Sequence, residues 1–287
     1  MRILITGAGG QLGRDLQDTL GGDEIHPATH GGDEIHPATH AELDIGSRAA
    51  VLGAIERIRP AVIINAAAFN DVDGAETSGE LALAVNGAGP GHLAEAAART
   101  GARLVHISTD YVFDGTKGSA YTEDDRPNPL SAYARSKYEG ELRVLDSEAA
   151  ACVLRTAWLY GRHGKNFVTT ILKAAERGGP LRVVSDQVGS PTSTHDLAEA
   201  IASLIRTPAR GLFHVVNRGA CSRYELARAV VGDRVEVEPI SSAEAARAAP
   251  RPANSSLVSV RWEAAGLPPL RTWEAALKDF LKGLAPG

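Results

Sequence analysis

A tyrosine and a lysine four residues apart form a pair of side chains that could transfer a proton. Tyr133 and Lys137 lie in the segment YARSK, within a stretch predicted to be helical. Residues at i and i+4 share one helical face, so the phenol and the ammonium can reach the same space. A neighbouring positive charge favours phenolate and lowers the tyrosine pKa from about 10. The pair therefore predicts a general acid that works near neutral pH, although alone it is common in helices without function.

A glycine-rich turn follows the first apolar segment of the chain. The segment TGAGGQLG, residues 6–13, contains Gly7, Gly10 and Gly13. Gly7 permits a tight turn, Gly10 lets a pyrophosphate approach the backbone, and Gly13 lets helix and strand pack closely. The free N–H groups at the start of the following helix favour an anion. In this strand–turn–helix context the motif predicts dinucleotide binding.

A polar cluster follows another apolar segment. In HISTDYVFDG, residues 106–115, Ser108, Thr109 and Asp110 fall at the carboxyl end of a predicted strand. Ligands of open α/β sheets bind at this edge, where Thr109 can donate a hydrogen bond to a substrate carbonyl. Taken alone, the cluster is more typical of a turn. Beside the other two motifs, it indicates a substrate site.

Alternating strands and helices must position these residues. Apolar runs that are buried on both faces predict a parallel sheet covered by helices. We therefore expect an α/β fold, a Rossmann-type doubly wound parallel sheet with a smaller, mostly C-terminal substrate lobe. The predicted strands are 2–6, 61–65, 102–108, 151–155 and 211–216. The predicted helices are 11–20, 47–58, 80–100 with an interruption near 87–91, 131–145, 166–177, 194–205, 222–231 and 271–284.

Two units follow from this pattern. Residues 1–155 and 189–217 are assigned to a dinucleotide-binding domain, and residues 156–188 and 218–287 to a substrate-binding lobe. The chain of 287 residues, 44% hydrophobic and 23% charged, is long enough for a sizeable core.

Composition narrows the classes of partner. The net charge of −5 gives no reason to expect nucleic acid or an anionic membrane surface. No apolar run approaches the roughly 20 residues of a membrane-spanning helix, and the N-terminus lacks the apolar core of a signal peptide. Cys152 and Cys221 are not in CxxC spacing, which favours buried, reduced thiols. We expect a cytoplasmic protein that binds neither nucleic acid nor membrane.

A decapeptide is duplicated without change, as residues 21–30 and 31–40. Its HPATH segments place histidines four apart, but Pro27 and Pro37 are tolerated only in the first turn of a helix, so we expect no metal site. One copy already suffices for the second strand of this fold. We predict that the second copy, Glu34–Thr39, forms that strand because it continues directly into residues 41–45. The first copy then lengthens the preceding loop.

The end of this second strand bears on the choice of cofactor. NAD enzymes commonly place an acid there to bind the ribose hydroxyls. Here the strand ends in Pro-Ala-Thr-His, without an acid and without an obvious arginine. We therefore predict that both cofactors are used, with NADPH better than NADH.

The motifs together resemble one family. The series TGAGGQLG, NAAAF, HISTDYVFDGT, YARSK, RTAWLYG and DQVGSPT is similar to the extended short-chain dehydrogenase/reductases, and within them to the dTDP-4-dehydrorhamnose reductase branch. The resemblance runs from residue 1 to about residue 280, and RPANSSL, residues 251–257, resembles a late Arg-Pro-x-x-Ser motif of the branch. It implies reduction of the C4 keto group of a dTDP-linked 4-keto-6-deoxy sugar by a nicotinamide cofactor.

The resemblance also implies roles for single residues. Tyr133 protonates the developing alkoxide, Lys137 holds the nicotinamide ribose and lowers the Tyr133 pKa, and Thr109 orients the carbonyl. Residues implied in cofactor binding are Gly7, Gly10, Gln11, Leu12, Gly13, Asp44, Ile45, Ala66, Ala67, Ala68, Tyr133 and Lys137. Residues implied in substrate binding are Thr109, Asp110, Trp158 and Arg251.

Several alternatives stay open at this point. Trp158 also fits a core position, and Arg251 also fits a solvated surface charge. Another dTDP-deoxysugar of secondary metabolism fits the motifs equally well as the substrate. Some relatives are cofactor-binding regulatory subunits, but the complete set of Thr109, Tyr133 and Lys137 favours an enzyme. A homodimer is expected only at the level of the family.

Overall fold

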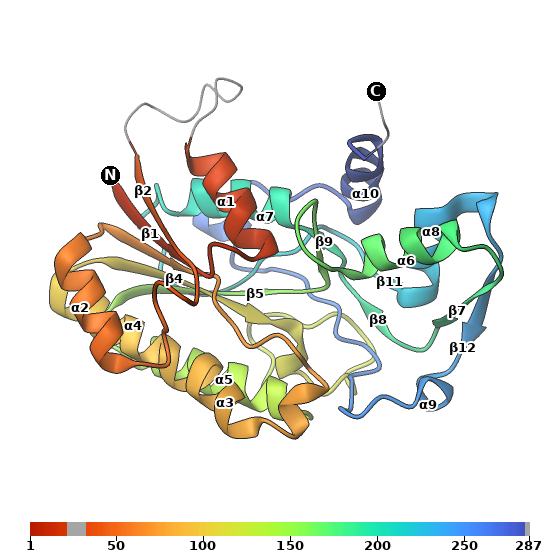
Figure 1. Ribbon diagram of the computed structural model, residues 1–287, viewed down its shortest axis with the longest axis horizontal. Helices are drawn as coiled ribbons and strands as arrows, with labels where there is room; N and C mark the ends of the chain where they lie inside the picture. Colours follow the sequence, from red (N-terminus) through yellow and green to blue (C-terminus); the bar gives the residue numbers. More distant parts are fainter. Residues whose placement is uncertain (22–32, 285–287) are drawn as a thin grey trace.

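A parallel sheet forms the centre of the molecule (Figure 1). The structure is a computed structural model that describes residues 1–21 and 33–284. Its six-stranded sheet has the order β10-β5-β4-β3-β1-β2, and every neighbouring pair is parallel. The strands are β1 (Arg2–Thr6), β2 (Glu34–Ala38), β3 (Val62–Asn65), β4 (Arg103–Thr109), β5 (Ala150–Thr156) and β10 (Gly211–His214). This arrangement confirms the predicted doubly wound α/β fold.

Helices cover both faces of the sheet. Figure 1 shows α1 (Gln11–Gly21) and α7 (Thr194–Leu204) on one face, and α2 (Arg48–Ile58), α4 (Gly89–Thr100) and α5 (Ala132–Leu145) on the other. Along β1, Ile3 and Ile5 pack into the cluster beneath α1 and α7, whereas Leu4 packs toward α2 and α4. Burial on both faces explains why the strands read as continuous apolar runs.

The helix predicted over residues 80–100 is interrupted without being broken. It consists of α3 (Gly79–Leu83), a π-helical turn η2 (Ala84–Ala88) and α4. Gly89 begins α4 where a side chain would press on Ile45, at 2.9 Å from its Cδ1. The glycines near residues 87–91, which suggested a break in the helix, therefore permit close packing instead.

The second copy of the duplicated decapeptide forms β2, as predicted. Glu34–Ala38 pairs with β1 along Arg2–Thr6. Asp33 fixes the start of this strand, accepting a hydrogen bond from the N-terminal ammonium at 2.7 Å and one from Arg206 at 2.9 Å. The expected loop formed by the first copy falls on residues 22–32, which lie outside the described residues.

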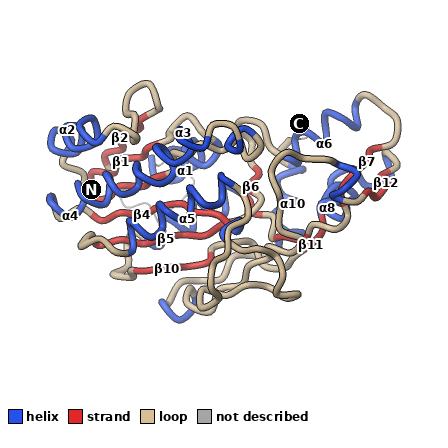
Figure 2. Tube along the Cα trace, turned by 90° about the horizontal axis from the view of Figure 1, so that it is seen from below, coloured by secondary structure: helices blue, strands red, loops and turns tan. Residues whose placement is uncertain are grey.

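Shorter elements form a second hydrophobic cluster beside the sheet, toward β7, β12, α6 and α8 (Figure 2). Three two-stranded pairs occur here, β7–β12, β8–β11 and β6–β9. The strands are β6 (Leu159–Tyr160), β7 (Leu181–Val184), β8 (Val188–Gly189), β9 (Thr192–Ser193), β11 (Cys221–Ser222) and β12 (Val237–Ile240). The helices are α6 (Phe167–Glu176), α8 (Arg223–Val231), α9 (Ser242–Ala245) and α10 (Trp273–Lys282). Short 3-10 turns occur after β3, as η1 (Gly74–Glu76), after β4, as η3 (Asp110–Val112), and later in the chain, as η4 (Gly232–Arg234) and η5 (Glu263–Ala265).

The division into two units stays a prediction. We propose that this separate cluster, with members such as Tyr160, Val168, Leu226 and Phe280, is the core of the substrate lobe. Cys152 and Cys221 are buried free thiols, as expected. Within the described residues, no helix has the length and apolar character needed to cross a membrane.

Candidate active site

The end of β4 and the start of α5 bring the three predicted catalytic residues together. Thr109, Tyr133 and Lys137 are all buried. The Thr109 hydroxyl donates to Asp110 Oδ1 at 3.1 Å and accepts from the Tyr111 backbone N–H at 3.2 Å, which caps the turn η3. Thr109 also hydrogen-bonds the Tyr133 phenol. Two motifs that lie apart in the sequence thus share one site.

Helix α5 presents Lys137 to the backbone of β4. Ser131 caps the helix, and its hydroxyl accepts from the Ala134 N–H at 3.1 Å. One turn after Tyr133, the Lys137 ammonium donates to the Ile107 carbonyl at 2.6 Å. Burial lowers the Lys137 pKa to about 8, and the nearby Glu141 carboxylate opposes that shift. The ammonium is therefore held at the strand end with a pKa close to neutrality.

The predicted lowering of the Tyr133 pKa by Lys137 is wrong for this structure. Burial is the largest influence and raises the Tyr133 pKa, and electrostatic interactions with Asp110 and Tyr111 add to that rise. The hydrogen bond with Thr109 acts in the opposite sense. The phenol is consequently neutral at physiological pH, which is the form that can donate a proton.

Asp110 is buried beside this group. Its carboxylate accepts from the Ser255 hydroxyl at 2.5 Å and from Thr109. Burial raises the Asp110 pKa to about 6, against the influence of Ser255 and of the Arg223 charge. Asp110 links the sheet edge to the segment RPANSSL, which contains Ser255.

A buried ion pair supports the same strand end. Arg155 and Glu141 are only 2% and 0% exposed, and they are joined by three hydrogen bonds of 2.7 to 3.2 Å. Ser108, opposite Arg155 in the β4–β5 register, donates to Glu141 at 2.5 Å. Such a pair costs free energy to bury, and its several hydrogen bonds hold it in position, although Arg155 Nη1 has no partner among the described residues. It fixes the helical turn that carries Lys137.

The π turn η2 places a buried asparagine that sequence reasoning missed. Asn86 accepts from the Phe69 N–H at 2.9 Å and donates to the Phe69 carbonyl and to Ser136, each at 3.0 Å. Ser136 in turn donates to the Tyr133 carbonyl at 2.7 Å. Asn86 thereby ties the loop after β3 to helix α5. A π-helical turn, which contains one extra residue, often occurs at a functional site. Such a turn leaves only a weak signal in the sequence.

The glycine-rich turn forms a tight cradle against the loop after β3. Gly7 has φ +71°, and a Cβ there would lie 2.5 Å from Ala67 N. A side chain at Gly13 would overlap the Gly7 carbonyl. The backbone of Ala66 and Ala67, in the loop after β3, thus lies directly against Gly7 of the turn. Since side chains would fill the cradle, its shape fits a dinucleotide.

The end of β2 contains charged groups that the sequence did not reveal. Thr39 donates from its N–H and its hydroxyl to Glu42, each at 2.8 Å. Arg14 of α1 donates to the Gly9 carbonyl at 3.4 Å, and Gly9 lies near the Thr39 methyl. The strand end therefore has both an acid and an arginine nearby, although neither is adjacent to it in sequence.

Asp44 and Ile45 flank this region. Asp44 is exposed, and its carboxylate accepts from the Gly46 N–H at 2.9 Å. Ile45 is buried against Gly89 at the start of α4, and its carbonyl contacts His92 Nδ1 at 3.1 Å. The pair thus presents one polar and one apolar residue beside the end of β2.

Trp158 and Arg251 are the other two residues that we expect to contact the substrate. Trp158 follows β5 with φ +48°, a conformation that is strained for a bulky residue. Its indole lies against Gly189, where an added Cβ would be 2.6 Å from Nε1. Arg251 is paired with Asp73 through hydrogen bonds of 3.0 and 2.9 Å, so it is more than a solvated surface charge.

Comparison with known proteins shows to which family the chain belongs. The family model RmlD substrate binding domain matches residues 1–285. The chain belongs to this family. It is 46% identical to the dTDP-4-dehydrorhamnose reductase of Mycobacterium tuberculosis, with 98% of this chain and 92% of that protein covered. It is 44% identical to a probable dTDP-4,6-dihydroxy-2-methyloxan-3-one 4-ketoreductase of Streptomyces antibioticus, with 97% and 94% covered.

A solved structure extends the likeness. The chain superposes on dTDP-4-dehydrorhamnose reductase from Bacillus anthracis, solved in complex with NADP, with a TM-score of 0.92 and 38% identity. The match covers 98% of this chain and 99% of that one. The RmlD-family fold is therefore present over nearly the whole chain.

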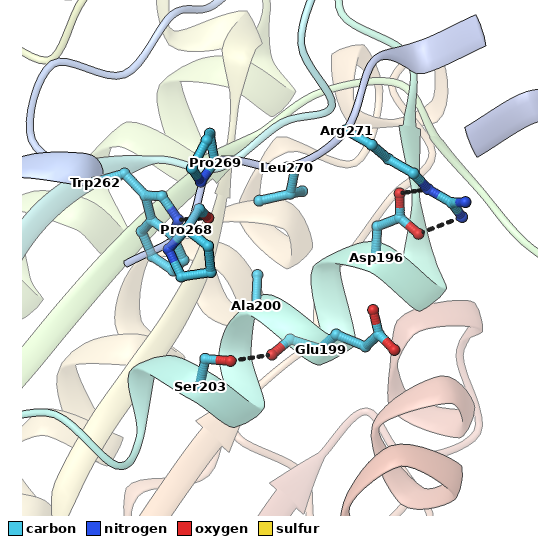
Figure 3. A pocket seen from close by; sticks show the side chains of 9 residues that line it. All are labelled: Asp196, Glu199, Ala200, Ser203, Trp262, Pro268, Pro269, Leu270 and Arg271. Atoms are coloured by element: carbon cyan, nitrogen blue, oxygen red, sulfur yellow. Dashed lines mark hydrogen bonds and ion pairs between the residues drawn. The ribbon is translucent and has the colours of Figure 1, made fainter. Parts of the chain in front are cut away.

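A separate cavity of about 310 Å³ in this RmlD-family chain shares no residue with the predicted site (Figure 3). It lies between α7 and the segment 262–271. On its rim, Arg271 donates to both oxygens of Asp196 at 2.8 Å. With its carboxylate satisfied in this way, Asp196 serves packing between elements.

Among the described residues, one group has the spacing of metal ligands. It consists of Asp15, Asp18 and His163, whose ligand atoms lie within 4.8 Å of one another. Exposed carboxylates commonly gather without an ion. The expectation of no metal site stays a prediction.

Proposed function

We propose that the chain is an NADPH-dependent reductase of the C4 keto group of a dTDP-4-keto-6-deoxyhexose. The reaction that fits most directly is dTDP-4-dehydro-L-rhamnose to dTDP-L-rhamnose. The convergence of Thr109, Tyr133 and Lys137 at the same carboxyl edge of the sheet as the glycine cradle carries this proposal. The names of the relatives support the substrate class.

The chain's own residues supply orientation and a proton. NADPH, when bound, supplies the hydride. Thr109 and Tyr133 direct hydroxyl groups at the carbonyl oxygen, whose negative charge grows during reduction. Donors aimed at developing charge stabilise the transition state more than the ground state. Tyr133 then gives its proton to this oxygen, and Lys137 keeps a positive charge nearby.

The remaining proposed contacts follow the cradle and the second lobe. We assign the pyrophosphate to Gly10, Gln11 and Leu12 at the start of α1. Gly7 and Gly13 shape the turn. Asp44 and Ile45 flank the adenine, and Ala66, Ala67 and Ala68 line the cofactor. Asp110 and Trp158 contact the sugar, and Arg251 contacts the diphosphate.

Both cofactors should be used, with NADPH preferred. Arg14 offers a cation for a 2′-phosphate near the end of β2, whereas Glu42 offers an acceptor for ribose hydroxyls. The NADP complex of the Bacillus anthracis relative supports the preference. A cytoplasmic location agrees with the two free thiols. A homodimer is proposed at the level of the family, and light scattering of the purified protein tests it.

A second substrate has its own support. The Streptomyces antibioticus relative is named for a different dTDP-linked ketosugar, at nearly the same identity. The two are separated by offering dTDP-4-dehydro-L-rhamnose and dTDP-4,6-dihydroxy-2-methyloxan-3-one in parallel with NADPH. We expect the higher kcat/KM with the first, and dTDP-L-rhamnose as the product by NMR. A higher kcat/KM with the second would move the chain to another dTDP-deoxysugar, and turnover of neither with NADPH bound would favour a regulatory role.

A further inference from the structure

Arg223 lies beside the proposed sugar site, although no motif pointed to it. It is the first residue of α8 and directly follows β11. The β8–β11 ladder pairs Cys221 with Gly189, the residue that contacts the Trp158 indole. The Arg223 guanidinium carbon lies 3.5 Å from the centre of the Trp158 ring and 5.0 Å from that of Phe167. The guanidinium is therefore stacked on the side chain assigned to the sugar.

The charge of Arg223 is poorly compensated within the chain. Among the described residues, no carboxylate forms an ion pair with it within 4.0 Å, although it is half-buried. Asp110 is near enough to interact, but its oxygens already accept from Ser255 and Thr109. Burial lowers the Arg223 pKa, and its place at the start of a helix is unfavourable for a cation. A cation withdrawn from water without a carboxylate partner favours an anionic ligand.

A second arginine shares the same neighbour. The Tyr111 side chain hydrogen-bonds both Arg223 and Arg251. Arg251 is held in place by Asp73, with its two hydrogen bonds of 3.0 and 2.9 Å. The Tyr111 ring also meets the Tyr133 ring edge to face, with centres 6.2 Å apart. Two guanidinium groups thus approach one phenol that adjoins the proposed proton donor.

We propose that Arg223 binds the diphosphate of the nucleotide sugar as a second cation beside Arg251. Guanidinium forks match phosphate oxygens well, and stacking on Trp158 orients the fork. In this arrangement Tyr111 separates the two arginines. The diphosphate is held on one side of Tyr111, and the keto group is directed toward Tyr133 on the other side. Arg223 is thereby a substrate-positioning residue. The identity of the ligand rests on the proposed function.

The test compares the affinities of dTDP and dTMP for the full-length protein by calorimetry. Arg223→Gln should weaken dTDP binding about tenfold to hundredfold, as expected for hydrogen bonds to a charged group. It should weaken dTMP binding much less, so that the preference for dTDP collapses. The affinity for NADPH should stay unchanged. With the ketosugar, KM should rise by the same factor as the dTDP dissociation constant.

Arg228→Gln is a matched control. Arg228 lies on the same helix, is exposed, and approaches the Tyr224 ring at 5.9 Å rather than the site. Its variant should bind dTDP and dTMP as the parent does. Arg223→Lys keeps the charge but loses the planar fork, and its dTDP affinity should fall between the parent and Arg223→Gln. It also serves as the deciding variant if Arg223→Gln no longer binds NADPH.

Three results would overturn the assignment. The first is that Arg223→Gln keeps the parent's preference for dTDP over dTMP. The second is that the parent protein itself shows no such preference. The third applies if Arg223→Gln is misfolded, and is that Arg223→Lys binds dTDP with the parent's affinity. The proposed function fails separately. If the parent binds dTDP but does not reduce the ketosugar, the reaction is contradicted, and the assignment of Arg223 is still decided by the two affinities.

Discussion

At the scale of single residues, the neutral state of Tyr133 and the charged state of Lys137 determine the chemistry. Burial acts on both groups but in opposite directions, raising the pKa of the phenol and lowering that of the ammonium. A reductase needs a protonated donor and a nearby cation. The two groups are therefore in suitable states together only below the pKa of Lys137.

The pH dependence of turnover follows from Lys137. Because its pKa is lowered to about 8, the ammonium is charged below pH 8 and loses its proton as the pH rises through that value. We expect kcat/KM for the ketosugar to fall above pH 8. Lys137→Arg, which stays charged throughout, should be slower but should lose this alkaline decline. If kcat/KM of the parent stayed constant up to pH 10, or if Lys137→Arg showed the same alkaline decline, the assignment of this decline to Lys137 would be contradicted.

At the scale of elements, the sequence predicted what depends on local pattern. The inner strands β1, β3, β4 and β5 are largely apolar runs, and α2 and α5 begin at serine caps, so their positions could be predicted from the sequence. The short pairs β7–β12 and β8–β11 were not predicted, because such brief strands carry little periodic signal. The three residues predicted to be catalytic could be proposed from the sequence because they lie in compact motifs.

Contacts through space explain the residues that were missed. Arg14, Asn86 and Arg223 reach the site from helices whose sequences show no distinctive motif. The expected pKa of Tyr133 was wrong because helical spacing identifies a neighbouring lysine but not the depth of burial. Burial is a property of the packed molecule, and here it outweighs that neighbour.

Gly189 tests how closely β8 must approach Trp158. Gly189→Ala would place a methyl group against the indole, 2.6 Å from Nε1, so we expect the free energy of unfolding to fall by about 1–3 kcal/mol. Gly53→Ala is a matched control, because Gly53 is exposed in α2 with no heavy atom of the described residues near its added Cβ. That control should gain about 0.5–1 kcal/mol. Equal stability of the two variants by urea denaturation would contradict the close contact.

Glu141 tests the buried support of α5. Glu141→Gln leaves the Arg155 charge buried without a carboxylate, so we expect a loss of about 3 kcal/mol or more in the free energy of unfolding. Glu95→Gln, which breaks the exposed pair with Arg48, should change stability little. The measurement is urea denaturation of both variants. A loss no greater than that of Glu95→Gln would show that the buried pair does not stabilise the fold.

At the scale of the whole molecule, the duplicated decapeptide is compatible with the complete sheet. The second copy supplies β2, and Asp33 fixes its start through the N-terminus and Arg206. One copy of the ten residues is sufficient for the pairing with β1. The six strands of the sheet that carries the cofactor cradle all lie within the described residues 1–21 and 33–284.

Deletion of residues 21–30 should consequently preserve the fold. The shorter chain keeps one full decapeptide, residues 31–40, which contains β2 and joins it to α1 through a short connection. Because the cost of closing a loop changes slowly with length, we expect the free energy of unfolding to change by less than about 1 kcal/mol. NADPH affinity should match the parent by fluorescence titration. Loss of cooperative unfolding or of NADPH binding would show that both copies are needed.

The most direct test of the account is NADPH oxidation by the purified protein with dTDP-4-dehydro-L-rhamnose, beside Tyr133→Phe. This variant removes only the phenolic hydroxyl that Thr109 hydrogen-bonds. We predict turnover by the parent and a fall in kcat of about 10²–10⁴-fold in Tyr133→Phe, with NADPH affinity retained. Turnover that is unchanged in Tyr133→Phe, or no turnover by a parent that binds NADPH and dTDP, would contradict it.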